Sequence, residues 1–222
     1  MRENHRGKSR IAVLKQKIII HQIKVGQYGN FSYLVYDSQA KAAVIFDPAF
    51  GITGIIKMLK EEGLELKYII NTHAHFDHIE GNEALAQATS AKIIMSAKSY
   101  AKKDIGVADG QTLKLTEDLL LRFLHTPGHS PESMCIVVND FALITGDTLF
   151  IGECGRTDLP DGSAEDLYES FAKLRKLNPK LLVYPGHDYG KVPSTTLAEQ
   201  LESNYTLAPR TKEEFVKFMS EP

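Results

Sequence analysis

The chain has 222 residues, of which 43% are hydrophobic and 24% are charged, so it is long enough to bury a core and has the size of one domain. Its formal net charge of −2 gives no electrostatic case for a nucleic-acid partner, which usually needs a basic surface. No apolar run approaches the roughly 18 residues of a membrane span. The two cysteines lack a CxxC spacing, which argues against a disulfide framework and favours a reducing cytoplasm. We therefore expect a soluble cytoplasmic protein with a small-molecule partner, and a homodimer stays open.

The first 17 residues differ in charge from the rest of the chain. Six Lys and Arg side chains face a single acid, Glu3. The apolar piece at residues 11–14 is too short for the core of a signal peptide, whereas an organelle transit segment stays open because such segments are also basic. We interpret residues 1–17 as a flexible, solvated segment and residues 18–222 as a single domain.

The next part of the chain predicts a meander of strands followed by a helix and a buried strand. Runs rich in β-branched and aromatic residues predict strands at residues 17–24, 31–36 and 42–46. Turn-forming residues separate these strands: Gly26, Gly29, Asn30 and Asp37 with Ser38. Apolar residues at helical spacing from Ile52 to Leu59, ended by Gly63, predict a helix. A strand at residues 68–70 then runs into a cluster of histidines, and the loop at the end of a buried strand is a rigid, accessible place for a site.

The second half repeats this order of strands and helices. We expect a helix at residues 81–88 and strands at residues 92–95, 119–124, 134–138, 141–144 and 181–184. Ser163 and Asp166 form a capping-box pattern, which opens a helix with apolar positions Leu167, Phe171 and Leu174. The duplicated order predicts an α/β fold in which two sheets pack face to face with helices outside, an αββα sandwich.

Five histidines and two aspartates are the most informative residues for function. They are His73, His75, Asp77, His78, His129, Asp147 and His187. Zinc and its neighbours bind imidazole nitrogen and carboxylate oxygen, and seven such ligands suffice for two ions when one carboxylate bridges them. Ordinary buried or surface histidines do not cluster beside acids at ligand spacing. The pattern therefore predicts a two-metal site.

The spacing of these residues suggests how the site divides. In an extended loop alternate side chains point the same way, so His73 and His75 can hold one ion while Asp77 and His78 turn towards another. Two later histidines each follow a Pro-Gly turn that would fix the ring, and each would complete one half-site.

Two aspartates remain to be placed. Asp147 is the natural bridge, because a carboxylate has two oxygens and can hold two cations a few ångströms apart. Asp47 precedes Pro48 at the end of a strand, where it either supports a ligand histidine or only forms a turn.

The segments THAHFDH, TPGHS, TGDT and PGHD, in this order over about residues 70–190, resemble the metallo-β-lactamase superfamily. The resemblance implies a four-layer αββα sandwich with two mixed sheets flanked by helices. It also implies a first metal on His73, His75 and His129, a second on Asp77, His78 and His187, and Asp147 between them. We expect two divalent ions, with zinc favoured and iron or manganese as alternatives.

Such a centre predicts hydrolysis. A water bound between two metals has its pKa lowered towards neutrality and becomes the nucleophile, while a metal polarises the carbonyl group of the substrate. Asp77 and Asp147 are the candidate catalytic carboxylates. Asp77 could also orient that water or accept its proton, although ligation is the simpler assignment.

The segment at residues 152–159 and the tail around Arg210 resemble the glyoxalase II and persulfide dioxygenase branch of the superfamily, whose members act on glutathione conjugates. The resemblance to the dioxygenases implies that Arg156 and Arg210 contact glutathione, whose two carboxylates suit guanidinium groups. Structural ion pairs to Asp158 or Glu214 are the alternative. Tyr189 either hydrogen-bonds the substrate or packs.

Our first prediction is a hydrolase that cleaves a thioester such as a hydroxyacylglutathione through a metal-bound hydroxide. The alternative is a persulfide dioxygenase with one Fe(II) on His73, His129 and Asp147. A non-catalytic metal-binding module is a third hypothesis. About 35 residues follow His187, too few for the separate helical domain of full-length glyoxalase II, but short single-domain thioesterases exist in the family. The CGRTD stretch favours the dioxygenase, and the Thr-Leu-Phe after Asp147 favours a hydrolase.

Overall fold

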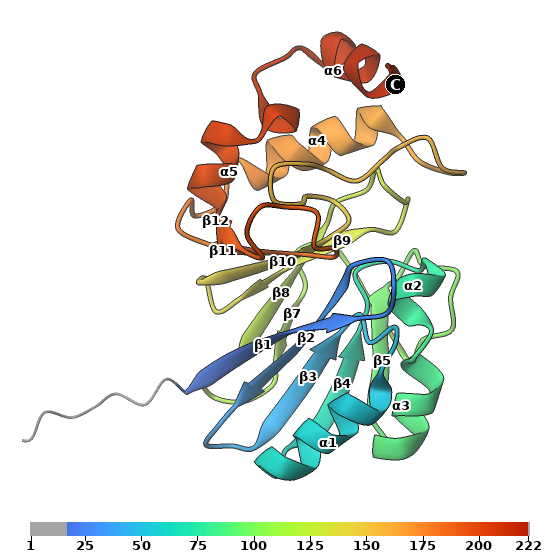
Figure 1. Ribbon diagram of the computed structural model, residues 1–222, viewed down its shortest axis with the longest axis vertical. Helices are drawn as coiled ribbons and strands as arrows, with labels where there is room; N and C mark the ends of the chain where they lie inside the picture. The colour runs from blue at the N-terminus through green and yellow to red at the C-terminus, as the bar shows by residue number, and fades with distance from the viewer. Residues whose placement is uncertain (1–16, 222) are drawn as a thin grey trace, which may run out of the picture.

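Two six-stranded sheets stack face to face between layers of helices in the computed structural model, which describes residues 17–221 (Figure 1). The segment interpreted as flexible therefore lies, up to residue 16, outside the described residues. The first sheet has the order β1-β2-β3-β4-β5-β6 and consists of β1 (Ile18–Val25), β2 (Asn30–Asp37), β3 (Ala42–Phe46), β4 (Glu65–Ile70), β5 (Lys92–Ser96) and β6 (Ile105–Val107). It is antiparallel from β1 to β3 and parallel from β3 to β6, so it is mixed.

The second sheet is also mixed and has the order β12-β11-β10-β9-β8-β7. Its strands are β7 (Thr112–Lys114), β8 (Leu120–His125), β9 (Met134–Val138), β10 (Ala142–Gly146), β11 (Leu182–Pro185) and β12 (Thr195–Thr196). Only β10 and β11 pair in parallel, and the other neighbours are antiparallel. The predicted pair of packed mixed sheets is confirmed.

Helices cover the outer face of each sheet, as predicted (Figure 1). The helices α1 (Ile52–Glu62) and α3 (Asn82–Thr89) lie on the first sheet, with the short α2 (Phe76–Ile79) between them in the chain. The helices α4 (Ala164–Leu174), α5 (Leu197–Ser203) and α6 (Lys212–Ser220) and the 3-10 turn η1 (Tyr205–Leu207) lie on the second sheet.

The alternation of side chains along the strands explains the four layers. In β9, Met134, Ile136 and Val138 point into the core between the sheets, whereas Cys135 and Val137 point outwards to the helices. Each sheet is therefore apolar on both faces at its centre, and inner strands such as β3 and β9 are continuous hydrophobic runs. Both cysteines of the chain are buried free thiols.

Several elements were not predicted from the sequence. The strands β6, β7 and β12 have at most three residues, and α5 and α6 lie in the segment after His187. The pattern at Ser163 is only half a capping box, because the Ser163 side chain accepts from the Asp166 N–H while its own N–H donates to the Gly128 carbonyl. This second bond ties the start of α4 to the turn that carries His129.

Phe215 anchors α6 to the core, and its removal should destabilise the fold. The side chain is 2% exposed and packs edge-to-face against Phe171 of α4. We expect Phe215→Ala to lower the free energy of unfolding by about 3–5 kcal/mol, as for other buried aromatic side chains. The matched control Lys217→Ala, on the exposed face of the same helix, should change it by less than about 0.5 kcal/mol. Urea denaturation followed by circular dichroism measures both, and equal effects would contradict this packing.

No helix in residues 17–221 is both long enough and apolar enough to cross a membrane.

Candidate metal centre

All seven predicted ligands lie at one edge of the sandwich, because each follows the end of a strand. His73 and His75 follow β4, and Asp77 and His78 lie on α2 immediately after them. The remaining ligands come from the second sheet, where His129 follows β8, Asp147 follows β10 and His187 follows β11. The two sheets thus contribute ligands to the same place.

The first half-site contains His73, His75 and His129, whose nitrogen atoms lie within 4.8 Å of one another. His75 Nδ1 is 3.0 Å from His73 Nε2 and 2.9 Å from His129 Nε2. The second half-site contains Asp77, His78 and His187, again within 4.8 Å. These are the two triples that the resemblance implies.

In the second half-site the imidazole and carboxylate atoms also converge on one point. His78 Nε2 is 3.3 Å from His187 Nε2, and Asp77 Oδ2 is 3.5 Å from His187 Nε2 and 3.7 Å from His78 Nε2. Such distances match the spacing of neighbouring ligands around an ion whose metal–nitrogen bonds are about 2.0–2.1 Å.

Asp147 lies between the two half-sites. Its Oδ2 is 3.2 Å from His187 Nε2 and 3.6 Å from His129 Nε2, and its Oδ1 approaches His78 Nε2 to 3.4 Å without hydrogen-bond geometry. Oδ1 is buried and has no hydrogen-bond partner among the described residues. A Cβ at Gly186 would collide with this oxygen, so glycine there leaves the space that the carboxylate occupies. A buried carboxylate oxygen without a donor fits a metal ligand.

The charges of the centre also suit a divalent cation. Burial, followed by the neighbouring His78, holds the pKa of His73 well below its ordinary value and so favours the neutral imidazole that binds metals. Burial alone would raise the pKa of Asp147, but the surrounding histidines, His78 first, hold it well below its usual range. Against the effect of burial, Asp147 raises the pKa of His78 to about 9 and also raises that of His187. The carboxylates thus attract positive charge to these two rings, which a divalent ion would supply in place of the protons.

The loop was predicted to be extended, and the structure differs in its second part, which is helical. His75 has extended backbone angles, φ −65° and ψ 145°, and α2 begins at the next residue. Asp77 and His78 are therefore presented from one helical turn, which brings both to His187 in the second half-site.

Asp47 contacts the candidate ligand His78 rather than only forming a turn. Its contacts therefore favour the interpretation that it supports a ligand histidine. Its Oδ2 accepts hydrogen bonds from His78 Nδ1 at 3.1 Å and from Thr72 Oγ1 at 2.7 Å, and its Oδ1 accepts from the Thr72 N–H at 2.8 Å. The side chain thus fixes both the ring of His78 and the start of the histidine loop.

Removal of this carboxylate should weaken metal binding without removing a ligand. We expect Asp47→Ala to lower the affinity for zinc by about 10–100-fold, the usual effect of losing a group that orients a ligand. Competition with a chromophoric chelator measures the affinity. Asp104→Ala, at a carboxylate that caps β5 remote from the seven ligands, is the control and should bind zinc as the unmodified protein does.

Backbone carbonyl groups orient two further histidines. A carbonyl oxygen can only accept, so His129 Nδ1 donates to the Arg156 carbonyl at 2.9 Å and His187 Nδ1 donates to the Tyr28 carbonyl at 3.0 Å. Both rings then present Nε2 to the centre as an acceptor.

Asn30 also supports the centre, although the sequence suggested only a turn. It is the first residue of β2, and its Nδ2 donates to both the carbonyl oxygen and the Oδ2 of Asp77, each at 3.0 Å. A lone asparagine next to a glycine gives no sequence signal for this role.

The three predicted substrate-binding residues fall in different surroundings. Arg156 and Tyr189 line a cavity of about 180 Å³ together with His129 and Asp147. The Arg156 guanidinium makes two hydrogen bonds of 2.5 Å to Asp158, the ion pair considered as the alternative. Tyr189 is 57% exposed and stacks on the His187 ring. Arg210 instead donates to the Tyr205 and Ala208 carbonyls and lies over the Phe218 ring, within the C-terminal packing.

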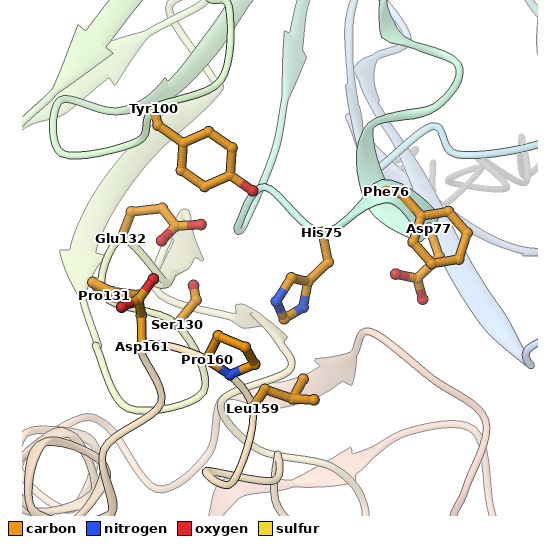
Figure 2. Close-up of a pocket in the computed structure, with 10 residues that line it drawn as sticks. All are labelled: His75, Phe76, Asp77, Tyr100, Ser130, Pro131, Glu132, Leu159, Pro160 and Asp161. Atoms are coloured by element: carbon orange, nitrogen blue, oxygen red, sulfur yellow. The ribbon is translucent and has the colours of Figure 1, made fainter.

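A larger cavity of about 520 Å³ opens beside His75 (Figure 2). It is lined by His75, Phe76, Asp77, Tyr100, Ser130, Pro131, Glu132, Leu159, Pro160 and Asp161. Sequence reasoning missed Glu132, whose Oε1 accepts from the Ala74 N–H at 2.9 Å. The cavity has the size of a small-molecule site.

An αββα sandwich with histidines and aspartates gathered at one edge defines a class of metal-dependent enzymes. The model of the family described as the metallo-beta-lactamase superfamily matches residues 25–103 and 96–187. The chain belongs to this superfamily, whose fold implies binding of divalent metal.

The similar proteins include both hydrolases and dioxygenases. The probable polyketide biosynthesis zinc-dependent hydrolase BaeB of Bacillus velezensis is 33% identical over 90% of this chain and 92% of its own length. Human persulfide dioxygenase ETHE1 is 37% identical over 86% of this chain and 76% of its own length. Hydroxyacylglutathione hydrolase of Pelagibacter ubique is 33% identical over 82% of this chain and 77% of its own length. The crystal structure of ETHE1 from Myxococcus xanthus has a TM-score of 0.86 and 32% identity, and covers 92% of both chains.

Proposed function

We propose that the protein is a dinuclear metal-dependent hydrolase, formed by residues 18–222 as a single domain, that cleaves thioesters of the hydroxyacylglutathione type. The observation that carries this proposal is the position of Asp147, which lies between two complete triples of ligand atoms. Two divalent ions held there would supply a water of lowered pKa and would polarise the thioester carbonyl group. Zinc is the favoured metal, because three histidines in the first half-site, and two histidines with a carboxylate in the second, are ligand sets that suit it.

Asp77 is the proposed acceptor of the proton released from that water. Its carboxylate is 16% exposed, compared with 9% for Asp147, and it lines the larger cavity. Asn30 donates to its Oδ2, the oxygen that also faces His78 and His187, which leaves Oδ1 as the oxygen that could accept a proton. Asp147 would be the carboxylate shared by the two ions, because it lies within 3.2–3.6 Å of the nitrogens of His187, His78 and His129.

Arg156 and Tyr189 are proposed to contact the thiol part of the substrate. Both line the smaller cavity beside His129 and Asp147, and a guanidinium group suits a carboxylate of glutathione. Because Arg156 is paired with the exposed Asp158, a substrate carboxylate would have to replace Asp158. Arg210 could contact the substrate only if its guanidinium group released the backbone carbonyls of Tyr205 and Ala208, to which it donates.

The second candidate function is a mononuclear Fe(II) persulfide dioxygenase on His73, His129 and Asp147. The observation that favours it is the similarity to ETHE1, which extends over 92% of this chain in the Myxococcus xanthus structure. The ligands of the two candidates overlap, so substrate turnover has to separate them.

The direct test is an assay of the zinc-loaded protein with S-lactoylglutathione, in which the released thiol is titrated. We expect cleavage that a chelator removes and added zinc restores. Consumption of O2 with glutathione persulfide by the iron-loaded protein, without thioester cleavage in either metal form, would replace the hydrolase by the dioxygenase.

A further inference from the structure

We propose that the larger cavity beside His75 receives the acyl group of the thioester and that Glu132 makes it select against acyl chains ending in a negative charge. This inference rests on the proposed function, because it assumes that a thioester is placed across the metal centre. It assigns a specificity-determining role to a residue that holds no metal and that neither the sequence motifs nor the proposed chemistry requires.

The charged side chains that line the larger cavity are all acidic. Of the ten described residues that line it, Asp77, Glu132 and Asp161 are acidic and none is Lys or Arg. The smaller cavity is lined by Asp147 and Glu153 as well, but it also contains Arg156, the one Lys or Arg among the residues that line either cavity. A substrate that spans both cavities therefore meets a cation in the smaller one, once a substrate carboxylate displaces Asp158 from Arg156. Its anionic, thiol-bearing part fits the side of Arg156, so the acyl part lies beside His75.

Glu132 is held rigidly at the inner wall of the cavity. Only 3% of the residue is exposed, and its Oε1 accepts from the N–H of Ala74, the residue between two of the predicted ligands. Figure 2 shows its carboxylate turned into the cavity, on the same side as the Tyr100 hydroxyl group. A fixed carboxylate in a partly desolvated wall repels a second carboxylate strongly and accepts a hydrogen bond from a hydroxyl or ammonium group.

The other walls suit an aliphatic or aromatic chain. Phe76 is 60% exposed and Tyr100 is 83% exposed, and both face the cavity with Leu159 and two prolines. Large aromatic side chains left this exposed beside a site commonly bind an apolar ligand group. The combination of apolar walls and a fixed acid favours neutral or hydroxylated acyl groups.

The inference can be tested by binding, without turnover, on the zinc-loaded protein. The probes are S-hexylglutathione and S-(5-carboxypentyl)glutathione, thioethers that differ in a terminal carboxylate and cannot be hydrolysed. We expect calorimetry to give a dissociation constant at least about tenfold larger for the carboxylated probe. In Glu132→Gln, whose amide oxygen can still accept from the Ala74 N–H, the ratio of the two constants should fall below about threefold.

The matched control is Glu165→Gln, which removes an equal charge at an exposed position outside the cavity lining and should keep the tenfold ratio. Equal binding of the two probes to the unmodified protein, or an unchanged ratio in Glu132→Gln, would overturn the inference and leave the proposed function in place. Failure of the proposed function would instead appear as absent cleavage of S-lactoylglutathione together with no detectable binding of S-hexylglutathione, and it would overturn the inference as well.

Discussion

Replacement of His129 by alanine should lower kcat/KM for a glutathione thioester by on the order of a thousandfold or more. His129 belongs to the first half-site, where its Nε2 is 2.9 Å from His75 Nδ1. Loss of the ligand removes several kcal/mol of transition-state stabilisation from a metal-assisted reaction, and about 1.4 kcal/mol corresponds to each factor of ten in rate. The dioxygenase alternative also uses His129, so this variant tests whether the centre carries the activity at all.

A matched histidine variant provides the control for this experiment. His21 lies on β1 and interacts with the Tyr36 hydroxyl group at 3.2 Å, remote from the seven ligands. His21→Ala should therefore keep its activity within about twofold. If His129→Ala retains the activity of His21→Ala under the same metal loading, the reaction does not occur at the proposed centre.

Replacement of His187 by alanine should separate the two candidate enzymes. It removes one of the three ligands of the second half-site, where His187 Nε2 is 3.3 Å from His78 Nε2. A dinuclear hydrolase should lose at least about a hundredfold in kcat/KM, and its metal content should fall towards one ion per chain. A mononuclear dioxygenase should keep most of its activity, because His187 is not one of its ligands.

Tyr189→Phe is the control for the His187 variant. The Tyr189 ring stacks on the His187 ring with centroids 4.9 Å apart, and phenylalanine retains that ring. The control should keep two metal ions. A fully active His187→Ala thioesterase would exclude the dinuclear arrangement.

The cluster of candidate ligands could be predicted from the sequence because metal coordination demands particular side chains at short spacing. His73, His75, Asp77 and His78 all lie within seven residues, and the later ligands each sit in a short motif with glycine. Their convergence in space followed from the expectation that strand ends gather at one edge of a sandwich. The αββα fold was predictable for a different reason, since the order of strands and helices repeats in the two halves of the chain.

The supporting residues could not be predicted because they act through groups that the sequence does not display. Glu132 binds the backbone N–H of Ala74, and His129 is oriented by a backbone carbonyl, so neither contact requires a particular partner residue. The strands β6 and β7 have three residues each, too few for an alternating pattern to be recognised. The α6 helix has one fully buried side chain, Phe215, and depends on the packing of α4 for its place.

The central claim is that the site holds two metal ions and hydrolyses a thioester. Elemental analysis of protein expressed without metal supplementation and purified anaerobically tests this claim most directly. Thioester cleavage and O2 uptake are assayed on the same sample. The account predicts about two zinc, iron or manganese ions per chain together with cleavage of the thioester. One iron per chain, with O2 consumed only in the presence of glutathione persulfide, would contradict it.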